Sequence, residues 1–193
     1  MKLIVGLGNP GKEYDGTRHN IGREIVRALG NDWRMQKKLH AEIAVYATRG
    51  ALVDTRAPLV RLAIPTTFMN DSGRAVQQLL STFDFRLSDL LVVHDDLDLP
   101  LGTLRFSHGS GAAGQKGVQS IIDTLGTKDF ARLRIGVAGA HRTTTDAADY
   151  VLKKFSKEEQ LLVRTIKKQA EQALMDFINK PLTSVMSTYN KKA

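Results

Sequence analysis

Residues 2–22 read KLIVGLGNPGKEYDGTRHNIG, and this stretch decides the fold of the chain. Residues 2–5 form a short run that predicts a buried strand. Three glycines and a proline interrupt that run, and a helical spacing of apolar residues begins only near the end of the stretch. A polar loop with Asn9, Tyr14 and His19 therefore lies between a strand and a helix. Ligands bind at this edge in open α/β sheets, so the loop is a candidate binding site.

The glycines of this stretch also match the dinucleotide-binding pattern G-x-G-x-x-G at Gly6, Gly8 and Gly11, with Asp32 further along. That pattern requires a helix that opens at its last glycine, so that helix N–H groups meet a pyrophosphate. Here Gly11 is followed by KEYDG, and Asp32 follows a turn instead of a second strand. We therefore reject a dinucleotide site and assign the glycines to a tight bend that approaches another group closely.

The composition indicates one ordinary globular domain, residues 1–193, with 42% hydrophobic and 25% charged residues. There is no cysteine, no apolar run of membrane-spanning length and no signal peptide, so we expect a cytoplasmic protein without a membrane partner. The formal net charge of +8 favours a polyanionic partner, nucleic acid above all, although solubility alone is the alternative explanation. Since only 6% of residues are aromatic, contact with phosphates is favoured over stacking on bases.

Apolar runs and helical patterns alternate along the chain. Strands are predicted at residues 2–5, 41–48, 60–64, 90–93, 102–106 and 133–137, with a return strand near Leu52. Helices are predicted from about residue 18, within 66–85, after the loop 107–117, at 146–153 and after a capping box of Ser156 and Glu159, with a frayed tail at 188–193. This alternation predicts an α/β fold: a single-domain three-layer sandwich whose mostly parallel mixed sheet is flanked by helices, with an antiparallel hairpin at 41–55.

The segment PTTFMN at residues 65–70 ends a predicted strand and precedes a helix. Asn70 carries both an amide donor and a carbonyl acceptor, so it can hold a substrate carbonyl or a water, or it can cap the helix. Phe68 and Met69 are residue types found more often in a core than in a ligand contact.

The acidic cluster HDDLD at residues 94–98 ends the next apolar strand. One histidine with carboxylates can bind a divalent cation, but no second histidine stands at ligand spacing, so we expect no metal site. A neutral imidazole that accepts a proton through one nitrogen needs an acceptor at its other nitrogen. Asp95 can supply that acceptor to His19, because Asp95 lies at the carboxyl end of one strand and His19 follows the carboxyl end of another. His94 is assigned a structural role.

These segments together resemble the bacterial-type peptidyl-tRNA hydrolases: GLGNPG, then Tyr14 and TRHN at 17–20, PTTFMN at 65–70 and the 94–98 cluster. The resemblance covers roughly residues 2–155. It implies hydrolysis of the ester between a peptide and the 3′ ribose of tRNA, without metal or cofactor. In that reaction His19 is the general base and Asp95 orients it. The resemblance also implies that Asn70 steadies the attacked carbonyl or the water, and that Asn9 reads the blocked α-amino group.

The resemblance further implies contacts with the acceptor stem and 3′ end of peptidyl-tRNA, made by a monomer. The implied contact residues are Tyr14, Phe68, Met69, Asn70, Lys116, Arg105 and Arg134. Arginine suits phosphate through its planar fork, although Arg105 and Arg134 can equally be solvated charges at a strand edge. Gln115 and Lys116 stand where the family usually has His-Asn, so either of them can replace the usual asparagine contact.

Two other classes of protein remain open from the sequence. One is a non-catalytic RNA-binding relative, against which the His19 and Asp95 pair argues. The other is a metal-dependent phosphohydrolase that uses the 94–98 cluster, and resistance to a chelator would exclude it.

Overall fold

The computed structural model describes residues 1–46, 60–139 and 146–190. Within these ranges the strands form a single mixed sheet in the order β2-β3-β4-β1-β5-β7-β6. The strands are β1 (Lys2–Gly6), β2 (Arg34–Gln36), β3 (Ala41–Val45), β4 (Val60–Pro65), β5 (Leu90–Pro100), β6 (Leu104–His108) and β7 (Ala131–Ala138). The central strands β4, β1, β5 and β7 are parallel to one another, whereas β3, β2 and β6 are antiparallel additions at the two edges.

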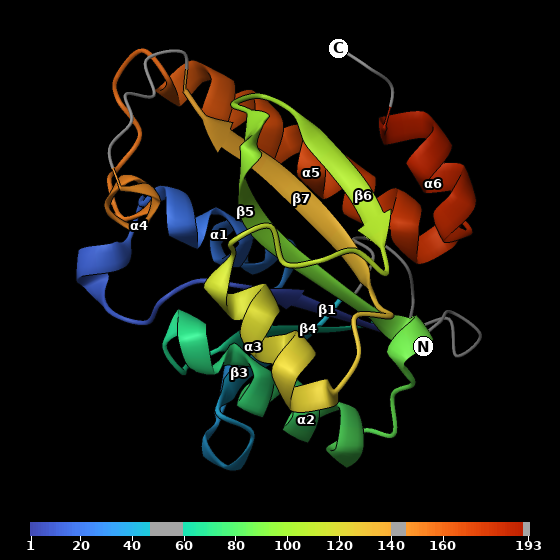
Figure 1. Ribbon diagram of the computed structural model, residues 1–193. Coiled ribbons are helices and arrows are strands. Elements are labelled where there is room, and N and C mark those ends of the chain that lie inside the picture. The colour runs from blue at the N-terminus through green and yellow to red at the C-terminus, as the bar shows by residue number, and fades with distance from the viewer. Residues whose placement is uncertain (47–59, 140–145, 191–193) are drawn as a thin grey trace.

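Helices cover both faces of this sheet, as Figure 1 shows. The helices are α1 (Ile21–Leu29), α2 (Ser72–Thr82), α3 (Lys116–Leu125), α4 (Ala147–Val151), α5 (Gln160–Asn179) and α6 (Leu182–Tyr189). Side chains of α1, α5 and α6 pack in one hydrophobic cluster, and those of α2 and α3 pack in the cluster on the opposite face. The predicted α/β architecture of three layers is confirmed.

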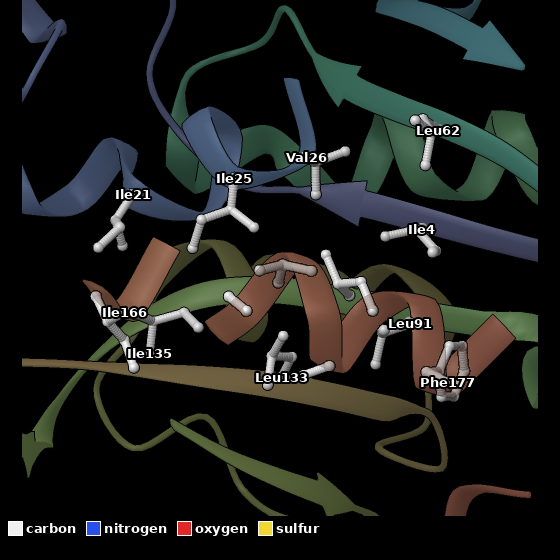
Figure 2. Packing of buried hydrophobic residues seen from close by; sticks show 14 of the residues in the cluster. Ile4, Ile21, Ile25, Val26, Leu62, Leu91, Leu133, Ile135, Ile166 and Phe177 are labelled. Atoms are coloured by element: carbon white, nitrogen blue, oxygen red, sulfur yellow. The ribbon is translucent and has the colours of Figure 1, made fainter. Parts of the chain in front are cut away.

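The core follows from the apolar runs of the central strands. Leu90, Leu91, Val92 and Val93 of β5 are all fully buried, and they alternate between the two clusters. Figure 2 shows the cluster on the α1 and α5 side, where Ile25 and Ile166 lie among side chains of β1, β5 and β7. Burial of this kind of side chain contributes about 1.5–3 kcal/mol each, so the sheet is held firmly and its carboxyl edge is a rigid support.

Helix α1 lies unusually close to β5 because Gly22 stands at the contact. A Cβ atom at this position would lie 2.3 Å from the carbonyl oxygen of Val93, which is closer than atoms can approach. The close approach brings the residues just before α1, including His19, against the end of β5.

Strand β5 is longer than the sequence indicates. The apolar run predicts an end at Val93, but Asp95 and Asp96 continue the parallel pairing with β7, and an irregularity follows before Pro100. The extension is possible because both carboxylates have partners at the edge of the sheet, so their burial is compensated. The prediction that the strand ends at residue 93 is therefore wrong.

Other boundaries also differ. Strand β6 begins two residues later than predicted, and the short β2, which pairs with β3, was not expected. The return strand near Leu52, and with it the predicted hairpin, lies outside the described residues. The tail is ordered further than expected, since α6 runs to Tyr189 and Asn190 exchanges two 2.8 Å hydrogen bonds with the backbone of Phe106. The capping box of Ser156 and Glu159 forms as predicted, with hydrogen bonds of 2.7 and 3.3 Å just before α5.

Candidate active site

A pocket of about 860 Å³ opens at the carboxyl edge of the sheet. The loops after β1 and β4 and the end of β5 form its floor, and the start of α3 and helix α4 form its walls. Of the residues predicted from sequence, those that line it are Asn9, His19, Phe68, Met69, Asn70, Asp95 and Lys116. Parallel strands place their carboxyl ends at one edge, which is why segments distant in sequence meet here.

His19 and Asp95 form a buried pair in this pocket. The imidazole Nδ1 lies 2.8 Å from Oδ2 of Asp95, and the two residues are 8% and 2% exposed. A carboxylate only accepts hydrogen bonds, so Nδ1 carries the proton and Nε2 is the nitrogen with a lone pair. Because His19 lines the pocket, that lone pair can face a ligand there.

The environment keeps Asp95 ionised despite its burial. Burial by itself raises the pKa of a carboxyl group, but the electrostatic interaction with His19 and the hydrogen bonds from His19 and Gln115 outweigh it and lower the pKa of Asp95. The bond from Gln115 runs from Nε2 to Oδ1 of Asp95 over 3.0 Å. Both carboxylate oxygens are therefore occupied by donors.

The segment that carries His19 is anchored through its neighbour Arg18. This guanidinium contacts both carboxylate oxygens of Glu159 at 2.6 and 2.8 Å, and it donates to the carbonyl of Lys154 at 2.6 Å. It also lies over the rings of Tyr150 and Phe155. The residue before His19 is thereby held against the chain around α4 and the start of α5.

Asn9 is held in place at three points. Its backbone N–H and carbonyl exchange hydrogen bonds with the side chain of Asn20, at 2.8 and 3.0 Å. Its side-chain Oδ1 accepts from the backbone N–H of Met69 at 2.8 Å. The amide nitrogen is then the end of Asn9 that can donate to a ligand in the pocket.

The loop after β4 gives the pocket an apolar rim. Met69 is buried, whereas Phe68 is 57% exposed, and Asn70 beside them is exposed. Tyr14 does not line the pocket, but its ring meets that of Phe68 edge-on, with 6.4 Å between the centroids. An exposed aromatic ring of this kind suits contact with an organic substrate.

Gln115 and Lys116 differ sharply in their surroundings. Gln115 is buried as the N-cap of α3, and Lys116 is the exposed first residue of that helix, on the wall of the pocket. Gly117 allows this arrangement, because a Cβ atom there would lie 2.4 Å from the sulfur of Met69.

Arg105 and Arg134 lie opposite each other in the β6–β7 ladder, outside the pocket. Arg105 is exposed. Arg134 is only 19% exposed at its side chain, and its Nε lies 2.5 Å from Oδ2 of the buried Asp96. The sequence did not indicate this ion pair, which offsets much of the positive charge that Arg134 can offer to a phosphate.

Within the described residues, no group of three or more histidine, aspartate or glutamate side chains is placed to hold a metal ion. Nor does any helix in those ranges have the length and apolar character needed to cross a membrane. His94 is buried, with Nδ1 2.7 Å from the backbone carbonyl of Asp95, so it lies inside the fold and not on the pocket wall.

The fold and the pocket define a three-layer α/β protein with a histidine–carboxylate pair at the carboxyl edge of its sheet. The family model "Peptidyl-tRNA hydrolase" matches residues 3–193. The chain is 42% identical over 191 residues to a peptidyl-tRNA hydrolase of Limosilactobacillus reuteri, covering 98% of this chain and 100% of that protein. It is also 42% identical over 190 residues to one of Syntrophomonas wolfei, with the same coverage. This chain belongs to the peptidyl-tRNA hydrolase family.

Solved structures agree with this assignment. The crystal structure of peptidyl-tRNA hydrolase from Acinetobacter baumannii superposes with a TM-score of 0.85 at 30% identity, covering 98% of this chain and 94% of that one. A complex of a peptidyl-tRNA hydrolase with N-propanol gives a TM-score of 0.86 with the same coverage. Family and fold thus support peptidyl-tRNA hydrolase function.

Several pocket residues were not found from the sequence. They include Leu97, Asp146, Val151 and Leu152 on the walls. Gln115 also lines the pocket, and the sequence named it only as the alternative to Lys116. The signal for Gln115 was its place directly before a helical pattern, where a side-chain acceptor is needed for a helix N–H. No local signal marks the others, because they reach the pocket only when α4 and the end of β5 come together.

Proposed function

We propose that this protein hydrolyses the ester that joins a peptide to the 3′ ribose of tRNA, with His19 as general base and Asp95 as the group that orients it. The observation that carries the proposal is the buried 2.8 Å contact between Nδ1 and the carboxylate, on the wall of a pocket. Such a contact leaves Nε2 able to take a proton from water.

In this reaction a water oxygen attacks the ester carbonyl carbon while its proton passes to Nε2 of His19. The tetrahedral intermediate collapses with cleavage of the bond to the ribose 3′ oxygen, which receives the proton from the imidazolium. The products are a peptide with a free carboxylic acid, which loses its proton to solvent, and a tRNA with a free 3′ hydroxyl. Asp95 stabilises the imidazolium in between. Asn70, exposed on the pocket wall, steadies the attacked carbonyl or the water.

Asn9 selects blocked substrates in this proposal. With Oδ1 bonded to the Met69 N–H, its amide nitrogen donates into the pocket. A peptide linkage offers a carbonyl acceptor to that donor, whereas the free ammonium of an aminoacyl-tRNA only donates. An unpaired donor facing another donor is costly, so the site rejects unblocked substrates.

The basic character of the chain supports tRNA as the partner. The net charge is +8, and Lys116 and Arg105 present exposed cations on the pocket wall and on β6. Tyr14, Phe68 and Met69 are proposed to contact the 3′ end, and Arg134 to contribute less than Arg105 because of its ion pair. We further propose that the protein acts as a monomer in the cytoplasm and needs no metal ion.

The test is release of free tRNA from N-acetyl-aminoacyl-tRNA, with unblocked aminoacyl-tRNA as the control substrate and a chelator present. We expect hydrolysis of the blocked substrate alone. His19→Ala should abolish turnover and leave tRNA binding intact. The matched control is His108→Ala, which removes an exposed histidine that pairs with Asp129. Near-normal turnover in His19→Ala would overturn the mechanism.

A further inference from the structure

Gln115 connects the start of helix α3 to the catalytic pair. It is 6% exposed and occupies the N-cap position of α3. Its Oε1 accepts from the backbone N–H of Val118 at 2.8 Å, and its Nε2 donates to Oδ1 of Asp95 at 3.0 Å. A second contact joins Nε2 to the sulfur of Met69 at 3.2 Å.

Chemistry fixes which way this amide points. The N–H of Val118 can only donate, so the oxygen of Gln115 must face it. The NH₂ group is then directed at the carboxylate of Asp95, which can only accept. The opposite orientation would set two donors against each other at one end and two acceptors at the other end.

We propose that Gln115 is a positioning residue for the reaction. It holds Oδ1 of Asp95, so that Oδ2 stays aimed at Nδ1 of His19 and the imidazole keeps its lone pair toward the pocket. This inference rests on the proposed function. Since its amide nitrogen contacts Asp95 and Met69, Gln115 has no hydrogen left to donate to a substrate, and the expected substrate contact is assigned to Lys116.

An amide suits this place because it does not titrate. The titratable groups that face Asp95 are His19 and the buried His94, and Lys116 follows Gln115 on the helix. Because the Gln115 amide does not ionise, its hydrogen bond to Asp95 does not change in strength with the ionisation of Gln115 itself. A carboxyl group in its place would share a proton with Asp95, because two neighbouring carboxylates do not both ionise freely.

The variant Gln115→Asn removes the hydrogen bond to Asp95 while it keeps an acceptor for the first N–H groups of α3. Asparagine is a favoured N-cap residue, so it can still accept from the helix, but it is one methylene shorter and cannot reach Asp95. We expect kcat to fall about 10- to 100-fold, the size expected for removal of one hydrogen bond to a charged group, with KM and Tm close to those of the parent. Unchanged kcat, or a loss of kcat that only follows a loss of Tm, would overturn the proposal.

Gln115→Glu gives a second test through its pH profile. Protonated glutamic acid can donate to Asp95 as the amide does, whereas ionised glutamate repels it. The kcat of this variant should fall as the pH rises through the pKa of the new pair. The matched control is Gln119→Glu, which makes the same charge change at an exposed site of α3. A profile identical to that of the parent would contradict the positioning role.

Imidazole ¹⁵N spectra keep the two hypotheses distinct. His19 should be an Nδ1–H tautomer in the parent and a mixture of tautomers in Gln115→Asn, whether or not tRNA is released. If the parent hydrolyses no blocked substrate, the proposed function fails while the tautomer still tests Gln115. If the parent is active and the tautomer is the same in both proteins, the positioning proposal fails alone.

Discussion

Asp95→Asn changes an acceptor-only carboxylate into an amide of nearly the same size. In the parent both oxygens accept: Oδ2 from His19 at 2.8 Å and Oδ1 from Gln115 at 3.0 Å. Asparagine has only one acceptor oxygen, so its NH₂ must face one of these two donors. If the oxygen stays with Gln115, the NH₂ faces Nδ1 and favours the tautomer that has its proton on Nε2. That tautomer cannot take a proton from water.

The expected loss of kcat is on the order of 10²- to 10⁴-fold, which corresponds to about 3–5 kcal/mol of transition-state stabilisation. The assay is single-turnover release of tRNA from N-acetyl-aminoacyl-tRNA, with KM measured alongside. KM should change little, because Asp95 is 2% exposed and acts through His19.

A double variant sharpens this prediction. Adding Gln115→Met removes the competing donor, so the asparagine oxygen can turn to Nδ1 and restore the productive tautomer. Asp95→Asn with Gln115→Met should therefore be faster than Asp95→Asn alone, although Gln115→Met alone is slower than the parent. The reasoning is refuted by near-normal turnover in Asp95→Asn, or by effects that simply multiply in the double variant.

Three further perturbations test the remaining charges. Arg105→Ala should flatten the log-affinity against log-salt slope for tRNA by about 0.7–0.9 for each phosphate that the protein no longer neutralises, and an unchanged slope would place the phosphate-binding residues elsewhere. Arg134→Ala removes the charged partner of the buried Asp96. The free energy of unfolding measured in urea should therefore fall by about 3–5 kcal/mol, and unaltered stability would contradict the ion pair. Burial lowers the pKa of His94 below its usual 6.5. Just below pH 6.5 the histidine is therefore protonated in the unfolded chain but not in the folded protein. The free energy of unfolding falls as the pH drops in this range. In His94→Asn the free energy of unfolding, measured in urea at several pH values, should depend less steeply on pH. An equally steep dependence would contradict the role assigned to His94.

The pairing of His19 with Asp95 was predictable because His19 follows the carboxyl end of β1 and Asp95 lies near the carboxyl end of the adjacent strand β5. Glycines mark the end of β1, and the apolar run of β5 leads into its acidic cluster. Parallel pairing of Leu3 with Leu90 through Gly6 with Val93 then brings the two ends together. Local sequence patterns were enough here, because parallel pairing places the carboxyl ends of neighbouring strands side by side.

The role of Arg134 was not predictable in the same way. Its bond to Asp96 depends on the register of β7 against β5, in which Arg134 stands opposite His94. A shift of one residue would turn that side chain to the other face of the sheet. The order of the tail likewise depends on two bonds between Asn190 and Phe106, residues 84 positions apart in the chain.

The sequence by itself determined the alternation of strands and helices, the polar loops at strand ends and the histidine and carboxylate that they carry, because these depend on neighbours along the chain. Only the tertiary structure decided that Gln115 is buried against Asp95 while Lys116 is exposed on the pocket wall. The place of Gln115 before a helical pattern indicates a helix cap, but no local pattern indicates that its amide reaches Asp95. The difference arises from the direction of α3 and the close approach of its first turn to Met69, which are set by packing between distant segments.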